Sequence, residues 1–265
     1  MSTPDVPLRI EISFEVPGTP DLVWDAIATA HGLSGWFLPT EVEEHVGGRV
    51  LFHMGPTDSE GRITDWEPPR RLVYEEADWA QLTGRDEAEV TPLATEFLVE
   101  ATSGGSCVVR IVSSAFGTGA DWEQEFFEQM NEGWEPYFQH LRLYLTHFPG
   151  QTATPLQAEA DVKAAPVAVA GAMLTALGLT ATSGPGDPVL LRGLPAVVEH
   201  IGEQHVVARL TDDPSGYFAF FAYEKGDGIS AANLSGYLFS DAAAGYVDRE
   251  QPGWQAWLGD LEVPS

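Results

Sequence analysis

The stretch Gly61-Arg62-Ile63-Thr64-Asp65-Trp66-Glu67-Pro68-Pro69-Arg70-Arg71-Leu72-Val73-Tyr74 determines the architecture expected for the first half of the chain. Residues 62–66 and 71–76 have strand-like composition, and the two prolines between them cannot continue a strand. We therefore expect two neighbouring strands and a tight connection. Further along the chain, aromatic side chains recur at helical spacing from Trp122 to Phe148, which predicts one long helix. Together these segments predict a curved antiparallel sheet closed by a long helix.

The segments on either side of this turn support the same architecture. Residues 9–16 alternate strictly, so that Ile10, Ile12, Phe14 and Val16 share one face of a half-buried strand. Pro20 suits the first turn of a short helix after that strand. The glycine pairs at 47–48 and 104–105 indicate turns between further strands. The resulting order of one strand, short helices, several strands and a long helix is that of an α+β domain.

The second half of the chain predicts a separate, smaller α+β unit. Residues 149–161 have the composition of a linker, and we expect domains at 8–148 and 162–265 on either side of it. The second domain shows an Ala-rich helix at 167–177, a closing helix at 254–261 and strand patterns at 189–191, 196–200, 206–210, 217–223 and 231–239. Its order of helix, strands and helix echoes the first domain, and a shortened, diverged copy is one interpretation.

Charge and composition exclude several classes of function. The 13 basic and 40 acidic residues give a net charge of −27, which disfavours nucleic acids and anionic membranes as partners. The single cysteine, Cys107, excludes an internal disulfide and lies in a strand-like run, as a buried structural thiol would. No signal peptide and no apolar run of membrane-spanning length is present, and we expect a cytoplasmic protein.

Several segments, in order and spacing, resemble the SRPBCC or START-like superfamily, whose fold is called helix-grip. Within it, residues from about 8 to 148 most resemble the domain first described in the activator of the heat-shock chaperone ATPase. The matching segments are residues 20–27, 33–37, 47–50, 61–74, 114–117 and 122–148. The resemblance implies a bacterial protein with a gap between sheet and helix that holds apolar or amphipathic small molecules or is filled with side chains.

A ligand in that gap would meet side chains from the strands and from the helix. The residues expected to line it are Phe52, His53, Trp66, Tyr74, Trp79, Phe97, Arg110, Phe127, Met130, Asn131 and Trp134. Pockets of this kind are mostly apolar with a few polar groups. The same aromatic spacing is also that of an ordinary core, Trp79 lies in the irregular stretch 77–92, and Arg110 equally suits a cross-strand ion pair.

Three functions are compatible with this sequence. The first is binding of a small hydrophobic or amphipathic molecule, without a defined catalytic activity, catalytic residue or cofactor. The second is a co-chaperone-like activator of a heat-shock chaperone ATPase, although the additional N-terminal domain that the eukaryotic co-chaperone uses is not seen ahead of residue 8. The third is an enzyme of the cyclase or aromatase type, which requires His53, Glu96 or Arg110 to point into the gap.

Metal and phosphate chemistry lack a sequence signature in this chain. It has no Gly-rich phosphate loop and no Gly-x-Ser-x-Gly nucleophile elbow. His200 and His205 do not follow the metalloprotease pattern, and we expect no metal site.

Overall fold

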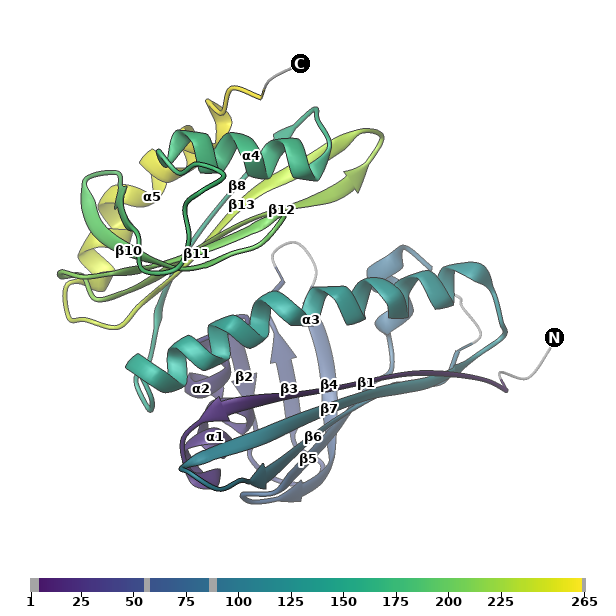
Figure 1. Cartoon of the computed structure of the whole chain (residues 1–265). Coiled ribbons are helices and arrows are strands. Elements are labelled where there is room, and N and C mark those ends of the chain that lie inside the picture. Colours follow the sequence, from purple (N-terminus) through teal and green to yellow (C-terminus); the bar gives the residue numbers. More distant parts are fainter. Residues whose placement is uncertain (1–4, 55–57, 86–89, 264–265) are drawn as a thin grey trace. The chain divides into compact units, whose positions relative to one another are not determined.

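The computed structural model describes residues 5–54, 58–85 and 90–263. The chain folds into two compact units, Met1–Thr152 and Ala153–Ser265, and each is built on its own antiparallel sheet (Figure 1). The α+β class predicted from the sequence, with a helix-grip fold followed by a second unit, is confirmed. Within the described residues, no helix combines the length and apolarity needed to cross a bilayer.

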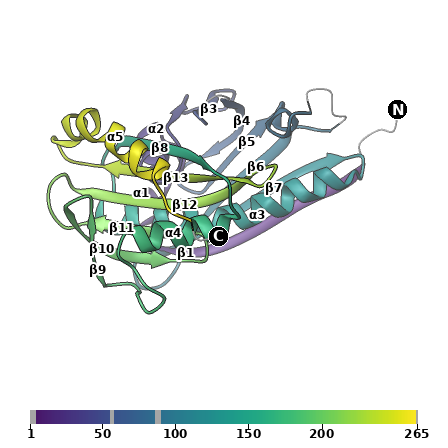
Figure 2. The same cartoon turned by 90° about the horizontal axis from the view of Figure 1, so that it is seen from above.

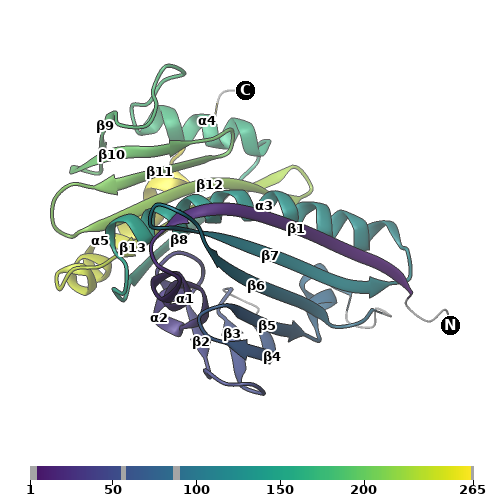
Figure 3. The same cartoon turned by 60° about the horizontal axis from the view of Figure 1, so that its bottom comes forward.

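In unit 1, a long helix lies across one face of a curved sheet (Figures 1 and 3). We call the face toward this helix the inner face. The described strands follow the order β1-β7-β6-β5-β4-β3-β2, so the first strand pairs with the last. The strands are β1 (Val6–Pro17), β2 (Thr40–Val42), β3 (Arg49–Phe52), β4 (Ser59–Glu67), β5 (Arg71–Glu76), β6 (Leu93–Ala101) and β7 (Ser106–Gly117). The helices are α1 (Pro20–Ala28), α2 (Ala30–Ser34), the 3-10 helix η1 (Trp79–Thr83) and α3 (Asp121–His147).

The turn between β4 and β5 has the tight geometry that its prolines predict. The Pro68–Pro69 peptide bond is cis, and the Arg70 backbone N–H donates to the Glu67 carbonyl oxygen at 2.7 Å. A bulge at Ile63–Asp65 shifts the register before the turn. Beyond the bulge Trp66 pairs with Leu72 and packs edge-on against Trp24 of α1, with ring centroids 5.0 Å apart.

The corner between α1 and α2 is held by close backbone packing. The Thr29 hydroxyl oxygen accepts from the Gly32 N–H at the start of α2, which is an N-cap contact. Gly32 lies so near α1 that a Cβ atom there would be 2.0 Å from the Asp25 carbonyl oxygen. The buried Trp36 indole N–H then donates to the Ala26 carbonyl oxygen at 2.9 Å. These contacts fix the short helices at one end of the sheet (Figure 3).

The long helix α3 is a single continuous element of 27 residues, although Pro136 lies inside it. Its N-terminus is capped by the buried Glu123, whose carboxylate accepts the backbone N–H groups of Thr118, Gly119 and Ala120. A carboxylate at this position satisfies otherwise unpaired N–H groups and complements the positive end of the helix dipole. The residues that α3 turns toward the sheet include Phe127, Trp134 and Phe138.

Unit 2 repeats the order of elements of unit 1, with one strand, one short α-helix and the 3-10 helix fewer among the described residues. Its strands follow the order β8-β13-β12-β11-β10-β9, so again the first pairs with the last, and α4 and α5 cover the same face of the sheet (Figure 2). The strands are β8 (Thr154–Val162), β9 (Pro188–Leu191), β10 (Leu194–Ile201), β11 (His205–Leu210), β12 (Gly216–Gly226) and β13 (Ile229–Leu238). The helices are α4 (Pro166–Ala176) and α5 (Ala243–Gly259).

The prediction that residues 149–161 form a linker is wrong for most of that segment. Residues 154–162 form β8, which pairs along its whole length with β13. Leu156 and Ala158 alternate toward the core of unit 2 and are buried. Alanine and proline have low strand propensity, so the local composition did not predict a strand here. Cross-strand pairing and burial stabilise the strand instead.

Aromatic side chains fill the space between the sheet and the helices of unit 2. Phe218 and Phe220 project from β12, and their ring centroids lie 5.3 and 5.8 Å from that of Trp254 on α5. Trp254 is fully buried, and its indole N–H donates to the Tyr246 hydroxyl oxygen at 3.0 Å. The space between α5 and the sheet of unit 2 is therefore packed with side chains.

Candidate functional site

The gap between α3 and the sheet of unit 1 is filled at the C-terminal end of the helix. The rings of Phe37, Phe52, Phe97, Trp134 and Phe138 form what we call the aromatic cluster. Trp134 stacks on Phe37 at 5.4 Å between centroids and meets Phe97 edge-on at 6.0 Å. Close-packed rings of this kind contribute to stability beyond the apolar area that they bury. At this end the cluster supplies an apolar wall.

A second apolar group lies near the N-terminal end of α3. Trp79, Phe127, Leu8, Leu93 and Ala115 pack together there and are all buried. The Trp79 indole N–H donates to the Thr91 carbonyl oxygen at 2.9 Å, which fixes the ring in this core. Trp79 is thus a core residue of unit 1. Part of the surrounding stretch, residues 86–89, lies outside the described residues.

Between these two apolar groups, a line of polar side chains crosses the inner face of the sheet. Tyr74 pairs in register with Thr95, and Thr95 pairs with Ser113, on three adjacent strands. Glu76 follows on the same face of β5 and accepts a hydrogen bond from the Ser59 hydroxyl of β4. We call these five residues the polar belt. All are buried, and Ser113 is 0% exposed.

Burial controls the charge of the two acidic groups in the polar belt. Desolvation raises the pKa of Glu76, and the hydrogen bond from Ser59 opposes this only in part. The pKa of Tyr74 lies well above its ordinary value because of burial and, secondarily, because of the nearby Glu76 charge. In the part of the chain that the structure describes, no arginine or lysine forms an ion pair with Glu76. A protonated Glu76 can donate as well as accept a hydrogen bond.

The raised pKa of Glu76 predicts a pH-dependent stability difference for Glu76→Gln. The raised pKa means that ionisation disfavours the folded state, so the wild-type protein loses stability as the pH rises through the folded pKa. Glutamine does not ionise, and the variant should gain relative to wild type with rising pH. Urea unfolding midpoints between pH 4 and pH 8 measure this difference.

The matched control is Glu75→Gln, since Glu75 is exposed and is the neighbour of Glu76 on β5. This control should show no comparable increase relative to wild type. A constant offset between Glu76→Gln and wild type at every pH would contradict the buried position of the carboxyl.

Trp134 brings a polar atom without a partner into this interior. Its side chain is 7% exposed, and its indole Nε1 has no hydrogen-bond acceptor among the described residues. A buried donor without an acceptor costs about 1–3 kcal/mol. An acceptor atom on a bound molecule could offset that cost.

A groove of about 530 Å³ opens between β1 and the N-terminal half of α3. Ile10 lines it from β1 and pairs in register with Ser113 at the end of the polar belt. Phe127 lines it from α3 and belongs at the same time to the second apolar group. Cross-strand neighbours of this kind have Cβ atoms about 4.5–5.5 Å apart. The groove therefore adjoins the polar belt.

The structure brings most of the predicted lining residues to the inner side of the sheet. Phe52, Tyr74 and Phe97 are buried and form successive ring contacts across β3, β5 and β6. Met130 is half-buried against the second apolar group, and the exposed Asn131 lines the groove.

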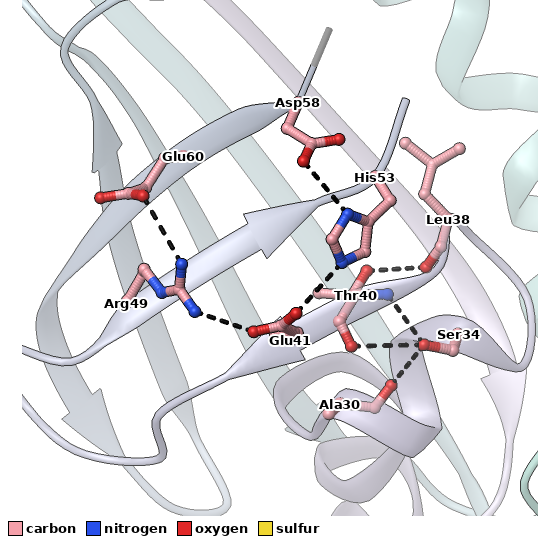
Figure 4. Close-up of polar contacts among 9 residues, drawn as sticks. All are labelled: Ala30, Ser34, Leu38, Thr40, Glu41, Arg49, His53, Asp58 and Glu60. Carbon is pink, nitrogen blue, oxygen red and sulfur yellow. Dashed lines mark hydrogen bonds and ion pairs between the residues drawn. The ribbon is translucent and has the colours of Figure 1, made fainter. Parts of the chain in front are cut away.

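His53 lies on the opposite side of β3 from Phe52. Its Nδ1 is 3.2 Å from Asp58 Oδ2, and its Nε2 is 3.3 Å from Glu41 Oε1 (Figure 4). Arg49 pairs with the same Glu41, at 2.8 Å. Each ring nitrogen of His53 therefore faces a surface carboxylate, and the prediction that His53 lines the gap is wrong.

Arg110 and Glu96 also point away from the gap. Arg110 lies between the buried Val109 and Ile111, and its guanidinium faces Glu11 at 3.5 Å and Glu100 at 3.8 Å. Glu96 accepts from the Arg71 Nε at 2.5 Å on the outer face of the sheet. The cyclase or aromatase hypothesis required His53, Glu96 or Arg110 to point into the gap. The geometry does not support an enzyme that uses these three residues.

Sequence reasoning missed the polar members of the interior. Of the polar belt, only Tyr74 was expected to line the gap. Glu76 shares a face with the buried Leu72 and Tyr74, and Thr95 shares one with Leu93 and Phe97. This spacing of two from buried apolar neighbours was the signal that could have placed both residues inside.

The comparison with known families bears on unit 1. Residues 17–146 match the family model described as Activator of Hsp90 ATPase homolog 1-like protein. Unit 1 is similar to this family over most of its length. The match ends at the close of α3, so unit 2 lies outside it. The predicted resemblance of unit 1 to the activator branch of the SRPBCC superfamily is confirmed. Among curated protein sequences, none matches the chain.

Solved structures resemble the chain over one unit or over both. The Aha1 dimer from Colwellia psychrerythraea has 17% identity and a TM-score of 0.42, covering 52% of this chain and 96% of that one. The di-domain ARO/CYC BexL from the BE-7585A biosynthetic pathway has 12% identity and a TM-score of 0.46, covering 96% and 99%. DynU16, from the dynemicin biosynthetic locus, has 14% identity and a TM-score of 0.42, covering 97% of each chain.

Proposed function

We propose that unit 1 binds a small amphipathic molecule between α3 and the inner face of its sheet. The observation that carries this proposal is the polar belt, which places hydroxyl and carboxyl groups between two apolar walls. Binding sites for small molecules combine a mostly apolar lining with a few placed polar groups. The groove beside Ile10 lies next to the belt and is the side from which the proposed molecule would enter.

The donor of Trp134 supports the same proposal. An indole N–H buried without an acceptor is costly in the empty protein, and a carbonyl or ether oxygen on the bound molecule would satisfy it. The aromatic cluster around Trp134 offers flat apolar surfaces for ring stacking. The proposed molecule therefore has an apolar, ring-containing body and at least one hydrogen-bond acceptor.

Thermal unfolding with a panel of hydroxylated and carbonyl-bearing aromatic compounds tests this proposal. A molecule that binds only the folded state raises the unfolding temperature. At a hundredfold excess over Kd, it increases the free energy of unfolding by about 2.7 kcal/mol. We expect stabilisation by such compounds and none by equally polar molecules without rings. A panel without any stabilising compound would count against the proposal.

Ser113→Ala should weaken such binding by about five- to tenfold, because one hydrogen bond to the ligand contributes about 1 kcal/mol. Isothermal titration calorimetry with the best compound of the panel measures the change. The matched control is Ser114→Ala, since Ser114 follows Ser113 on β7 and points to the opposite face. Equal affinities of the two variants would remove the polar belt from the proposed site.

A co-chaperone-like role is the second candidate, and the family match over residues 17–146 is the observation that favours it. Its test is stimulation of the ATPase of a purified heat-shock chaperone by the full chain. If the ATPase rate does not change at a large excess of the chain, this candidate is excluded.

A further inference from the structure

The two-residue turn between β9 and β10 in unit 2 holds an arginine in an unfavourable backbone conformation. Arg192 and Gly193 have φ values of 50° and 92°, and the flanking Leu191 and Leu194 pair across the turn. Turns with two such residues favour asparagine or glycine, because a larger side chain is strained in the left-handed region. The arginine is therefore kept at a position where the backbone alone would not select it.

The helix opposite this turn leaves room for the arginine side chain. The Arg192 guanidinium lies over the Trp254 ring, 5.4 Å from the ring centroid. A Cβ atom on the neighbouring Gly253 would be 2.4 Å from Arg192 Nη2. Glycine is unfavourable inside a helix, but here it allows the guanidinium to approach the backbone of α5. Arg192 in the turn and Gly253 in the helix are each unfavourable for the local backbone, and together they place the guanidinium against α5.

The N–H donors of this guanidinium have no hydrogen-bond partner among the described residues. Arg192 Nη2 is 4.0 Å from Glu250 Oε2, which is too far for a hydrogen bond, and Glu250 accepts from Arg249 at 2.8 Å. Stacking on Trp254 engages the flat face of the guanidinium. The N–H groups in its plane remain able to bind an acceptor.

An apolar groove of about 790 Å³ begins at this arginine and runs between α4 and α5. Its walls include Ala172 and Ala176 from α4, Trp257 from α5 and Leu261 after it. Asp260 and Glu262 also line the groove, and both are exposed. The groove therefore has one cationic end, an apolar wall and an acidic rim.

We propose that unit 2 binds an amphipathic monocarboxylate in this groove, with the carboxylate on Arg192 and the apolar body between α4 and α5. The guanidinium fork matches a carboxylate with two parallel N–H···O bonds. The carboxylates of Asp260 and Glu262 repel a second negative charge, so the site selects molecules with one anionic group. This site is separate from the one proposed in unit 1.

Calorimetric titration of the full chain with sodium decanoate tests the proposal, and 1-decanol serves as the uncharged analogue. Arg192→Asn removes the guanidinium but suits the left-handed turn, so the variant should fold with an unfolding temperature close to that of the wild type. We expect decanoate to bind Arg192→Asn about tenfold or more weakly than wild type, with Arg192→Lys in between. Arg209→Gln removes one cation elsewhere in unit 2, where Arg209 pairs with Glu199, and should bind as the wild type does.

Three results would overturn the proposal: no binding of decanoate by the wild type, equal binding of 1-decanol and decanoate, or unchanged binding by Arg192→Asn. The unit 1 variant Ser113→Ala separates the two sites. Its affinity for decanoate should equal that of the wild type, and a matching loss in this variant would place decanoate in unit 1 and overturn the assignment to unit 2.

Discussion

Replacing Gly32 with alanine should destabilise unit 1 by about 3 kcal/mol or more, at the upper end of the range for overpacked sites. The added Cβ would lie 2.0 Å from the Asp25 carbonyl oxygen and 2.7 Å from the Ala26 Cα. Both neighbours are backbone atoms, so no side-chain rotation relieves the clash. The α1–α2 corner would have to open, and the hydrogen bond from Trp36 to Ala26 would be lost with it.

Urea unfolding followed by far-ultraviolet circular dichroism measures this loss. Gly133→Ala is the matched control, because a Cβ at Gly133 meets no atom within 4 Å and the residue lies exposed inside α3. An alanine there should stabilise the helix by about 0.5–1 kcal/mol. Equal stability of the two alanine variants would show that α1 and α2 do not pack as closely as described.

Trp254→Ala should have the second large effect, a loss of about 4 kcal/mol from unit 2, in the range measured for buried tryptophans. The ring is fully buried and contacts Phe218, Phe220 and Trp257. Its removal leaves a cavity under α5 and takes the hydrogen-bond donor away from the Tyr246 hydroxyl. It also removes the surface on which the Arg192 guanidinium rests.

Two variants in the same helix make this experiment specific. Trp257→Ala should cost less than Trp254→Ala, because Trp257 is only half-buried. Trp254→Phe keeps an aromatic ring in the core and should recover a large part of the lost stability. If Trp254→Ala and Trp257→Ala are equally stable in guanidinium chloride, the packing of unit 2 differs from that described.

The sequence predicted the elements of unit 1 because its strands and long helix bury one face each. Strict alternation at 9–16 corresponds to the centre of β1, and the helical spacing from Trp122 to Phe148 corresponds to α3 within one residue at each end. In unit 2 the expected strands fall on observed strands and the Ala-rich helix falls on α4, but α5 begins at Ala243, well before the expected closing helix at 254–261. Periodicity is a strong signal when burial is one-sided.

Where both faces of a strand are apolar, the sequence could not say which side chains point inward. Arg110 lies among Val108, Val109, Ile111 and Val112, so alternation alone did not assign its face. The pairing of β7 with β1 and β6 places Arg110 beside surface carboxylates instead. His53, directly after Phe52, was misplaced for the same reason, since a shift of one residue reverses the face.

The polar belt was hidden for a different reason. Serine, threonine and glutamate are mostly surface residues, so residue type argued against placing Glu76 or Ser113 in the interior. Their burial depends on the pairing of four consecutive strands, β4 to β7, into one sheet. Such positions are set by the tertiary structure and leave only the weak signal of alternation.

The pairing of first and last strands in each unit has a consequence for biosynthesis. β1 ends at Pro17, but β7, its one neighbour among the described strands, begins at Ser106. At a translation rate of about 5–20 residues per second, β1 must wait on the order of several seconds before its partner has been made. β8 waits in the same way for β13. Nascent chains of this protein therefore expose an unpaired strand with one apolar face twice during synthesis. Each unit can complete its sheet only after its last strand has left the ribosome.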